Sequence, residues 1–488
     1  MMTRPTVIVS IPHGAAAGNV LRTGLVRRLL DAPEAPEVVL ASPLVNDAAF
    51  AAEFRHPRIR LEDLPPHKPS GLEARLLAMV QAGYIGSGVT ESVRIRRAEA
   101  VAARTIRWIR AKRLLASVAA PSLLRPRTRY ALSDRWVAHL YADRLFDAYG
   151  PSLLVTSSPG LILSEVPLLR TAARRRVRSM AIDPSWDNFT NKLLPVRRVD
   201  RLIVWNDLMK HQAVDLHGYE PDEIRVAGAP QWDLYFRPGP AVTRDAFFRR
   251  IGADPQRKLV TLTTTPRELY SHHDHVLRVL AGAIEAGRWP CATQILVRLH
   301  PRDNRAAYAA FERTPHVILE KPFRSTVRAG DGLDVDVTAE NQQHLADTLR
   351  HSDVIVNVAS TIAVEAAIFD TPVVNVSFDG EAPSPWERSA RRYYRFTHYV
   401  NVTRHGAARV ADTPDALVEE IGRYFVDPSR DREGRHRVAL EQCQFLDGRS
   451  AERVARFVAD ELAAVCGTAV DADREELSSA KPSVARRL

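Results

Sequence analysis

The sequence is short of cysteine and of long apolar runs, and each shortage removes a class of protein. Only three of its 488 residues are cysteines, Cys291, Cys443 and Cys466, and none form a Cys-x-x-Cys pair. Neither a disulfide framework nor a cysteine-based zinc site is therefore indicated. No stretch approaches the ~18–20 apolar residues of a membrane span, and the apolar run near the N-terminus is too short for a signal peptide. We expect a cytoplasmic protein, soluble or peripheral on the inner face of the cell membrane.

Acidic residues are outnumbered by basic ones, 58 to 68, which gives a net charge of +10. Such a balance favours anionic partners, namely nucleotides, nucleic acid or acidic lipid. A coding bias toward arginine is an equally good explanation for the high arginine content. Eleven basic residues and a single acid, Glu99, lie between Arg94 and Arg129. No RNA-binding signature accompanies them, so we expect no nucleic-acid partner and a contact of this region with an anionic membrane surface.

Short apolar strands alternate with amphipathic helices along both halves of the chain, and this rhythm predicts parallel sheets covered by helices. The first helix is expected over Asn19–Leu30. The strands are expected at Thr6–Ser10, Glu37–Ala41, near Ile59, Ser152–Thr156, Val177–Asp183, Arg201–Trp205, Ile224–Pro230, Lys258–Thr263, Gln294–Leu299, Asp353–Asn357 and Pro372–Val376.

This order of elements predicts an α/β protein with two Rossmann-like domains that face a cleft. The first domain covers residues 1–236 and carries a helical, arginine-rich insertion at about 65–130. A segment rich in proline and small residues, Arg237–Thr243, links it to a second domain at 244–466. Residues 467–488 are polar and without periodicity, so we expect a disordered tail.

Three polar motifs follow strands of the second half, where ligands bind in open α/β sheets. His300 stands in Arg298-Leu299-His300-Pro301-Arg302, and Pro301 fixes the turn that presents its imidazole. Ser360 and Thr361 open a helix, whose N-terminus attracts phosphate, and Glu365 falls one turn later, within reach of a ribose. Thr264 and Thr265 follow the first strand of this half. Each motif also has an ordinary explanation, a turn histidine, simple helix capping or a threonine-rich strand end.

The second half, from about residue 200 to 465, resembles nucleotide-sugar glycosyltransferases of the GT-B fold. It is most similar to the branch that includes CDP-glycerol:poly(glycerophosphate) transferases and CMP-sugar transferases. The resemblance implies that His300-Pro301 and Ser360-Thr361 hold the donor phosphates, together with Arg298 and Arg302. The glycerophosphate enzymes carry an Asp before the serine pair, where this chain has Asn357-Val358-Ala359. Non-hydrolysing UDP-sugar 2-epimerases share the architecture, but their Ser-Gly-Gly helix start is missing here.

The first half is expected to bind the acceptor. His13 follows the first strand, where it would face the cleft, and its pKa range suits a general base that deprotonates an acceptor hydroxyl. Asp183 and Asp187, in a polar loop after another strand, are alternative bases. In the same loop Trp186, Asn188 and Lys192 combine an aromatic face with polar groups, a combination that proteins use to hold sugars. A turn histidine and an Asp/Asn-rich capping loop remain the ordinary alternatives.

We therefore predict a glycosyltransferase that moves a sugar from a UDP-, CMP- or CDP-linked donor to a cell-surface glycan or lipid-linked acceptor. No metal and no cofactor are expected, because basic side chains and helix N-termini can neutralise the leaving phosphate. The Asp334-Val335-Asp336 triplet is expected in a solvated loop. A CDP-glycerol-type polyol-phosphate transferase is one alternative, and a non-catalytic nucleotide- or membrane-binding protein is another.

Overall fold

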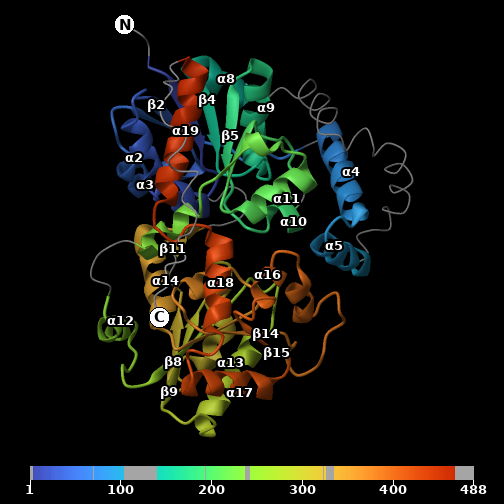
Figure 1. Ribbon diagram of the computed structural model, residues 1–488, viewed down its shortest axis with the longest axis vertical. Helices are drawn as coiled ribbons and strands as arrows, with labels where there is room; N and C mark the ends of the chain where they lie inside the picture. Colours follow the sequence, from blue (N-terminus) through green and yellow to red (C-terminus); the bar gives the residue numbers. More distant parts are fainter. Residues whose placement is uncertain are drawn as a thin grey trace.

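The computed structural model describes residues 4–69, 71–103, 140–192, 194–236, 242–321, 324–325 and 335–467. Two α/β units lie one above the other along the longest axis of the molecule, the first unit at the top (Figure 1). The expected tail at 467–488 falls outside the described residues from 468 on, and so do most of the linker and residues 104–129 of the basic region. None of the helices in the described part of the chain is both long and apolar enough to cross a bilayer.

The first sheet has seven parallel strands in the order β3-β2-β1-β4-β5-β6-β7. They are β1 (Thr6–Ser10), β2 (Glu37–Ala41), β3 (Ile59–Glu62), β4 (Leu153–Thr156), β5 (Arg178–Ile182), β6 (Arg201–Val204) and β7 (Ile224–Val226). Alternate side chains enter two apolar clusters, so the sheet is buried on both faces. The helices are α1 (Gly14–Ala16), α2 (Leu25–Leu30), α3 (Ala48–Glu53), α4 (Gly71–Ser87), α5 (Glu91–Ala102), α8 (Leu140–Tyr149), α9 (Val166–Arg175), α10 (Asn188–Asn191) and α11 (Asp207–His217).

The second sheet has six parallel strands in the order β10-β9-β8-β13-β14-β15. They are β8 (Lys258–Thr263), β9 (Thr293–Arg298), β10 (Val317–Glu320), β13 (Val354–Asn357), β14 (Val373–Val376) and β15 (Arg409–Ala411). Its helices are α12 (Arg244–Ile251), α13 (His273–Glu285), α14 (Ala339–His351), α15 (Ile362–Ile368), α16 (Val400–Thr403), α17 (Pro414–Val426) and α18 (Arg432–Cys443). Both sheets thus follow the Rossmann order, with a switch point between the first and fourth strands of each unit.

The helix expected over Asn19–Leu30 is broken in the structure. Its first part belongs to a π-helical turn, η1 (Ala17–Leu21). Gly24 then adopts the left-handed backbone at φ 90° before α2 begins. Glycine adopts this conformation without steric cost, so the chain changes direction there. The turn also meets the second domain, since Arg22 donates to the carbonyl of Val337 at 2.8 Å. Val335–Asp336, expected in a solvated loop, pairs as strand β12 with β11 (Arg324–Ser325).

The last helix, α19 (Ser450–Cys466), packs on the first sheet, although the expected boundaries placed residues up to 466 with the second domain. Val454, Val458 and Leu462 join the apolar cluster that β1, β2 and α2 form. Figure 1 shows α19 running along the upper unit, while α18 stays in the lower one. The apolar face of α19 is buried against this sheet, and this burial explains why the chain crosses back to the first domain.

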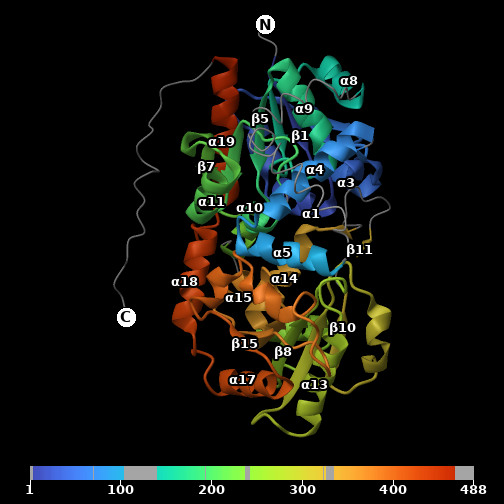
Figure 2. The same ribbon diagram turned by 90° about the vertical axis from the view of Figure 1, so that its right-hand side faces the viewer.

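The helical insertion does more than cover the first domain, because α5 lies between the two units (Figure 2). Arg392, from the 3₁₀ turn η7 (Ala390–Arg395) of the second domain, donates to Glu99 at 2.7 Å. The backbone N–H of Thr397 donates to the Ser92 hydroxyl at 2.8 Å. The described part of the insertion therefore bridges the domains.

Candidate functional site

The three motifs of the second half meet at adjacent strand ends. His300 follows β9, Thr264 follows β8, and Ser360 follows β13, and these strands are neighbours in the sheet. The β8–β13 pair is the switch point, where the crossover connections diverge and leave a crevice. The fold thus brings together groups that lie up to about 100 residues apart in the sequence. Neighbouring strands are ~4.8 Å apart, so the turns that follow them are neighbours too.

His300 is held in one tautomer by its own turn. Its Nδ1 accepts a hydrogen bond from the backbone N–H of Arg302 at 3.1 Å. Burial, helped by the positive charge of Arg302, lowers the pKa of His300 to about 4. The ring is therefore neutral at pH 7, and its proton resides on Nε2, which has no hydrogen-bond partner among the described residues and could donate to a ligand oxygen.

Thr264 and Thr265 make different hydrogen bonds. The Thr264 hydroxyl accepts from the backbone N–H of His300 at 2.9 Å and so ties the β8 turn to the β9 turn. The backbone N–H of Thr265 donates to Nε2 of His273 at 2.9 Å. Burial lowers the pKa of His273 to about 3, so this ring is a neutral acceptor. His273 was missing from the sequence prediction because it opens helix α13, away from any strand end.

Ser360 caps the short helix α15, since its hydroxyl accepts from the backbone N–H of Ile362 at 3.3 Å. Thr361 occupies the N-cap position without a side-chain capping bond. Glu365 is buried, and the Tyr235 hydroxyl, from the 3₁₀ turn η5 (Pro230–Phe236), donates to its carboxylate. Burial raises the pKa of Glu365 to about 7. In this structure Glu365 binds the link between the domains, and its ribose contact stays a prediction.

A row of buried polar side chains crosses the second sheet below these turns. Register places Thr263 beside Arg298 and Asn357 beside Asn375, and the two pairs lie at the ends of the neighbouring strands β8 and β13. In-register residues of a parallel sheet point to the same face. The Thr263 hydroxyl and both amide atoms of Asn357 are buried without a partner in the described part of the chain. Buried polar groups of this kind bind water or ligand in functional sites.

Arg298, expected to hold donor phosphate, lies within that row and is buried. Its Nη1 is 3.4 Å from the Glu320 carboxylate on β10. Arg302, by contrast, is half exposed, with an Nη2 3.6 Å from Glu268. Of the two arginines, Arg302 is the one that solvent or a ligand reaches.

In the first domain, His13 sits at the switch point of its sheet, after β1 and opposite β4. The side chain caps α1, with Nδ1 accepting from the backbone N–H of Ala16 at 3.1 Å. Next to it, after β4, Ser157 and Ser158 donate to buried Glu165 at 3.0 and 2.6 Å. Burial raises the pKa of Glu165 to about 7, against these hydrogen bonds. The sequence analysis missed this cluster, although Ser157-Ser158 at a strand end is the same signal that identified Ser360-Thr361.

Asp183 and Asp187, in the loop after β5, have widely separated pKa values, so Asp183 is largely protonated and Asp187 is ionised at neutral pH. Burial raises the pKa of Asp183 to about 8, although Asn188 donates to it at 2.5 Å. Asp187 is buried too, but Lys192, whose Nζ is 3.6 Å away, and hydrogen bonds from Ser185 and Asn191 hold its pKa at about 2. Two carboxyls with separated pKa values suit a site that handles a proton.

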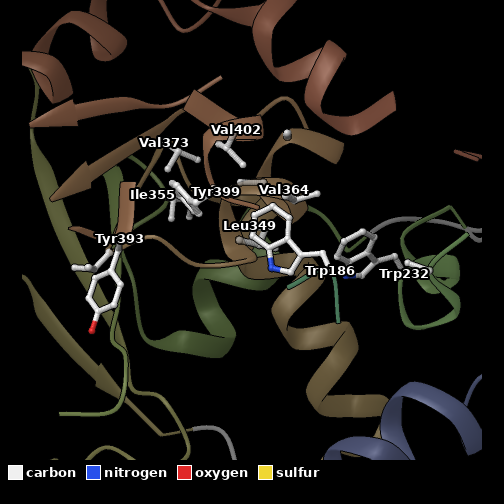
Figure 3. Close-up of a cluster of buried hydrophobic side chains, with 14 of the residues drawn as sticks. Trp186, Trp232, Leu349, Ile355, Val364, Val373, Tyr393, Tyr399 and Val402 are labelled. Carbon is white, nitrogen blue, oxygen red and sulfur yellow. The ribbon is translucent and has the colours of Figure 1, made fainter. Parts of the chain in front are cut away.

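The predicted acceptor residues divide between packing and exposure. Trp186 is buried, edge-on to His398 and Tyr399 of the second domain at 5.1 and 6.0 Å between ring centroids. Figure 3 shows its indole among apolar side chains of that domain. Asn188 is buried on Asp183, while Lys192 keeps 48% of its side chain exposed. The ring of Trp186 thus joins the domains here, and a sugar contact by these residues stays a prediction.

The second domain gathers groups that suit an anion at its strand ends, and the first domain gathers candidate bases at its own strand ends. Neutral Nε2–H of His300, backbone N–H groups at the start of α15 and the guanidinium of Arg302 supply donors for an anion. His13, Asp183 and Asp187 supply candidate bases. Among the described residues, no group of three or more His, Cys, Asp or Glu side chains is arranged to hold a metal ion. The arrangement suits group transfer from a phosphate-activated donor.

Comparison with known proteins agrees with this geometry. The family model of CDP-Glycerol:Poly(glycerophosphate) glycerophosphotransferase matches residues 167–460, more than half of the chain. A lipid-A-disaccharide synthase of Geobacter sulfurreducens is 26% identical over 336 residues, which cover 64% of this chain and 77% of that protein.

Two solved structures share the fold. A putative UDP-N-acetylglucosamine 2-epimerase from Listeria monocytogenes has a TM-score of 0.53 at 13% identity and covers 95% of this chain and 98% of its own. MnaA of S. aureus, solved with UDP, has a TM-score of 0.54 at 10% identity with the same coverage. At such identities the likeness speaks for the fold alone, and it confirms the two facing Rossmann-like domains of the GT-B type.

Proposed function

The chain belongs to the CDP-glycerol:poly(glycerophosphate) glycerophosphotransferase family and is also similar to a lipid-A-disaccharide synthase, and from both we propose that it transfers a sugar from a nucleotide-activated donor to a hydroxyl of a glycan or lipid-linked acceptor. The observation that carries the proposal is the meeting of His300, Thr264 and Ser360 at three adjacent strand ends beside the switch point. Donor phosphates would lie there. The acceptor would approach from the facing edge of the first domain.

In the proposed reaction the acceptor oxygen forms a bond to the anomeric carbon, and the bond from that carbon to the diphosphate breaks. The nucleoside diphosphate leaves with the electron pair, and the acceptor proton passes to a base of the first domain. The Nε2–H of His300 and the Arg302 guanidinium stabilise the growing negative charge on the leaving phosphate. No metal is needed for this step if those donors are in place.

Identification of the nucleotide is the first test. The full chain is screened by thermal shift against UDP, CMP, CDP, GDP and dTDP, because a ligand that binds only the folded state raises the melting temperature. We expect one pyrimidine nucleotide to stabilise the protein well above the others. No shift with any nucleotide would leave a non-catalytic role, and binding to anionic membrane would then be the function to examine.

Transfer of glycerophosphate is the second candidate, and the family match favours it. In that reaction the acceptor hydroxyl attacks the phosphorus next to glycerol, and CMP is the leaving group. The products distinguish the two reactions, since sugar transfer from UDP- or CDP-linked donors releases a nucleoside diphosphate. Supplying CDP-glycerol and UDP-sugars with a hydroxylated acceptor, and separating the nucleotides released, decides between them.

The base is assigned by two substitutions. His13→Ala is expected to lower turnover strongly and to leave nucleotide affinity nearly unchanged, because His13 lies on the domain opposite the donor site. Asp187→Asn is the competing test, since Asp187 is ionised at neutral pH. Full turnover in His13→Ala, with loss in Asp187→Asn, would transfer the role to the aspartate loop.

Membrane contact through Arg94–Arg129 is a further part of the proposal, supported within the described residues by Arg94 on α5, whose side chain is 65% exposed. Each basic residue near an anionic surface contributes ~1 kcal/mol at most, screened by salt. In liposome sedimentation we expect binding to anionic vesicles that falls with salt. Equal binding to neutral vesicles would argue against the electrostatic contact.

A further inference from the structure

The donor turn, residues 358–361 between β13 and α15, has a strained backbone. Ala359 adopts φ 37°, in the left-handed region that residues with a Cβ rarely enter. Such a conformation persists only where neighbouring contacts hold it, and it is found most often at binding sites. The contacts around Ala359 therefore determine how the turn presents Ser360 and Thr361 to a ligand.

The hydroxyl of Tyr399 fastens the donor turn to strand β14. Tyr399 is fully buried and directly precedes α16. Its hydroxyl donates to the side-chain oxygen of Asn375 at 2.9 Å, and the backbone N–H of Ser360 donates to the same hydroxyl. A phenolic hydroxyl is both a donor and an acceptor, so Tyr399 uses both capacities to join the two chain segments.

A second tyrosine repeats this arrangement one residue along both segments. The hydroxyl of Tyr394 donates to the carbonyl of Val376 at 2.6 Å, and the backbone N–H of Ala359 donates to it. The rings of Tyr394 and Tyr399 pack edge-on, 5.5 Å between their centroids. The two tyrosines thus hold the strained residue and its successor from one side.

The first domain contacts the segment that carries these tyrosines. Trp186, in the aspartate loop (183–192), packs its indole edge-on against the Tyr399 ring, 6.0 Å between ring centroids (Figure 3). Two residues before Tyr399, the backbone N–H of Thr397 donates to Ser92 of α5 at 2.8 Å. Tyr399 therefore contacts the donor turn through its hydroxyl and the first domain through its ring.

We propose that Tyr399 is a positioning residue for the transfer: it holds the donor turn in the conformation that binds the nucleotide, and it makes that conformation depend on Trp186 of the first domain. The proposal rests on the proposed function, because the turn belongs to the donor site of the same reaction. Tyr399 acts through Ser360 and does not itself touch the donor. The position of the aspartate loop then affects donor binding, since one side chain contacts both.

Amide hydrogen exchange of the full chain, followed by mass spectrometry without ligand, reports on the turn directly. Tyr399→Phe removes the hydroxyl and keeps the ring, and we expect the amides of the donor turn to exchange at least roughly tenfold faster. Tyr424→Phe in α17 is the matched control, because it also removes a buried hydroxyl, one that donates to Asp431 at 2.7 Å. Parental exchange of the turn in Tyr399→Phe would overturn the proposal.

Trp186→Leu tests the dependence on the first domain. We expect faster exchange in the same turn, although the substitution lies in the other domain, and exchange closer to the parent in Trp186→Phe, which keeps an aromatic edge. Trp289→Leu is the control, since it removes a buried indole that packs edge-on against Phe425, within the second domain. Parental exchange of the turn in Trp186→Leu would overturn the link between the domains.

Ala359→Gly separates positioning from general stability. Glycine adopts the left-handed conformation without steric cost, so a turn with Gly at 359 needs the tyrosine less. In calorimetric titrations with UDP and with CDP, we expect Tyr399→Phe to weaken the tighter nucleotide roughly tenfold in the parent and roughly threefold or less in Ala359→Gly. Equal losses in both proteins would overturn the positioning role, because a loss of general stability acts on both alike.

The two measurements also separate this proposal from the proposed function. Faster exchange of the donor turn in Tyr399→Phe, in a chain that binds neither nucleotide, would support the hold of Tyr399 on the turn and overturn the donor site. Parental nucleotide affinity in Tyr399→Phe would overturn the positioning role and leave the proposed function standing.

Discussion

His300→Ala tests how the donor phosphate is held. In the structure the imidazole is neutral, because burial lowers the pKa of His300 to about 4, and its Nδ1 already accepts from the backbone of Arg302. The remaining Nε2–H can donate one hydrogen bond to a phosphate oxygen. The substitution removes that donor and leaves the backbone N–H of His300 bound to the Thr264 hydroxyl.

The expected loss follows from that single contact. A hydrogen bond to a charged partner contributes about 1.5–3 kcal/mol, which corresponds to roughly 10- to 150-fold in affinity. Water can enter in place of the ring because the site lies at the edge of the sheet, so we expect the lower end, roughly tenfold. His300→Gln restores an N–H donor and should recover part of the loss. His436→Ala, at an exposed position of α18, is the matched control and should bind like the parent.

Calorimetric titration of the cognate nucleotide at several pH values gives the decisive measurement. A histidine whose pKa lies at about 4 stays neutral from pH 8 to about 5.5, so the affinity ratio of parent to His300→Ala should be constant over that range. A ring with an ordinary pKa near 6.5 would become charged below that value and bind phosphate more tightly. A ratio that grows as the pH falls from 7 to 5.5 would refute the neutral-donor reasoning, and equal affinity at every pH would move the donor site elsewhere.

Three further predictions concern stability. The folded-state pKa of Asp183, about 8, lies above its ordinary value, so its burial destabilises the fold increasingly as pH rises from about 4 to 8; Asp183→Asn should therefore gain stability relative to the parent over that range in urea titrations, and a constant difference would contradict the raised pKa. Arg170→Met removes the guanidinium that pairs with buried Glu73 and leaves that carboxylate with the His67 imidazole at 3.2 Å, and we expect a loss of about 3–5 kcal/mol in the free energy of unfolding, whereas Arg437→Met at an exposed position of α18 should change it little. Gly160→Ala would place a Cβ 1.9 Å from the Arg197 carbonyl oxygen at φ +82°; we expect a clearly lower melting temperature, with Gly287→Ala, at positive φ but in open space, as the control for backbone strain alone.

The strand ends were predictable from sequence because β-branched runs that stop at polar residues mark both an element and its edge. Thr6–Ser10 and Lys258–Thr263 have the predicted bounds in the structure. The break at Gly24 was missed because the apolar spacing continues across it, and its direction depends on a contact with Val337. The partner of Glu365 was equally hidden, since Tyr235 lies 130 residues away and only the packed fold brings the two together. His273 and Glu165 act on residues at strand ends without standing there themselves.

The return of α19 to the first sheet has a consequence for the order in which the protein forms during synthesis. Val454, Ala455, Val458 and Leu462 complete an apolar cluster whose other buried members come from the first 203 residues and Ala227. On the ribosome the first domain must therefore wait, with part of one sheet face exposed, until the last helix has emerged, by which time the second domain has been made. The Asp233 carboxylate lies in η5, where the chain first passes from one domain to the other. It accepts hydrogen bonds from the backbone N–H groups of Ser450 and Ala451 at 2.9 and 2.7 Å and so anchors the start of α19. The core of the first domain is thus complete only when residues 450–466 are present, and a nascent chain that stalls before residue 450 exposes part of that core.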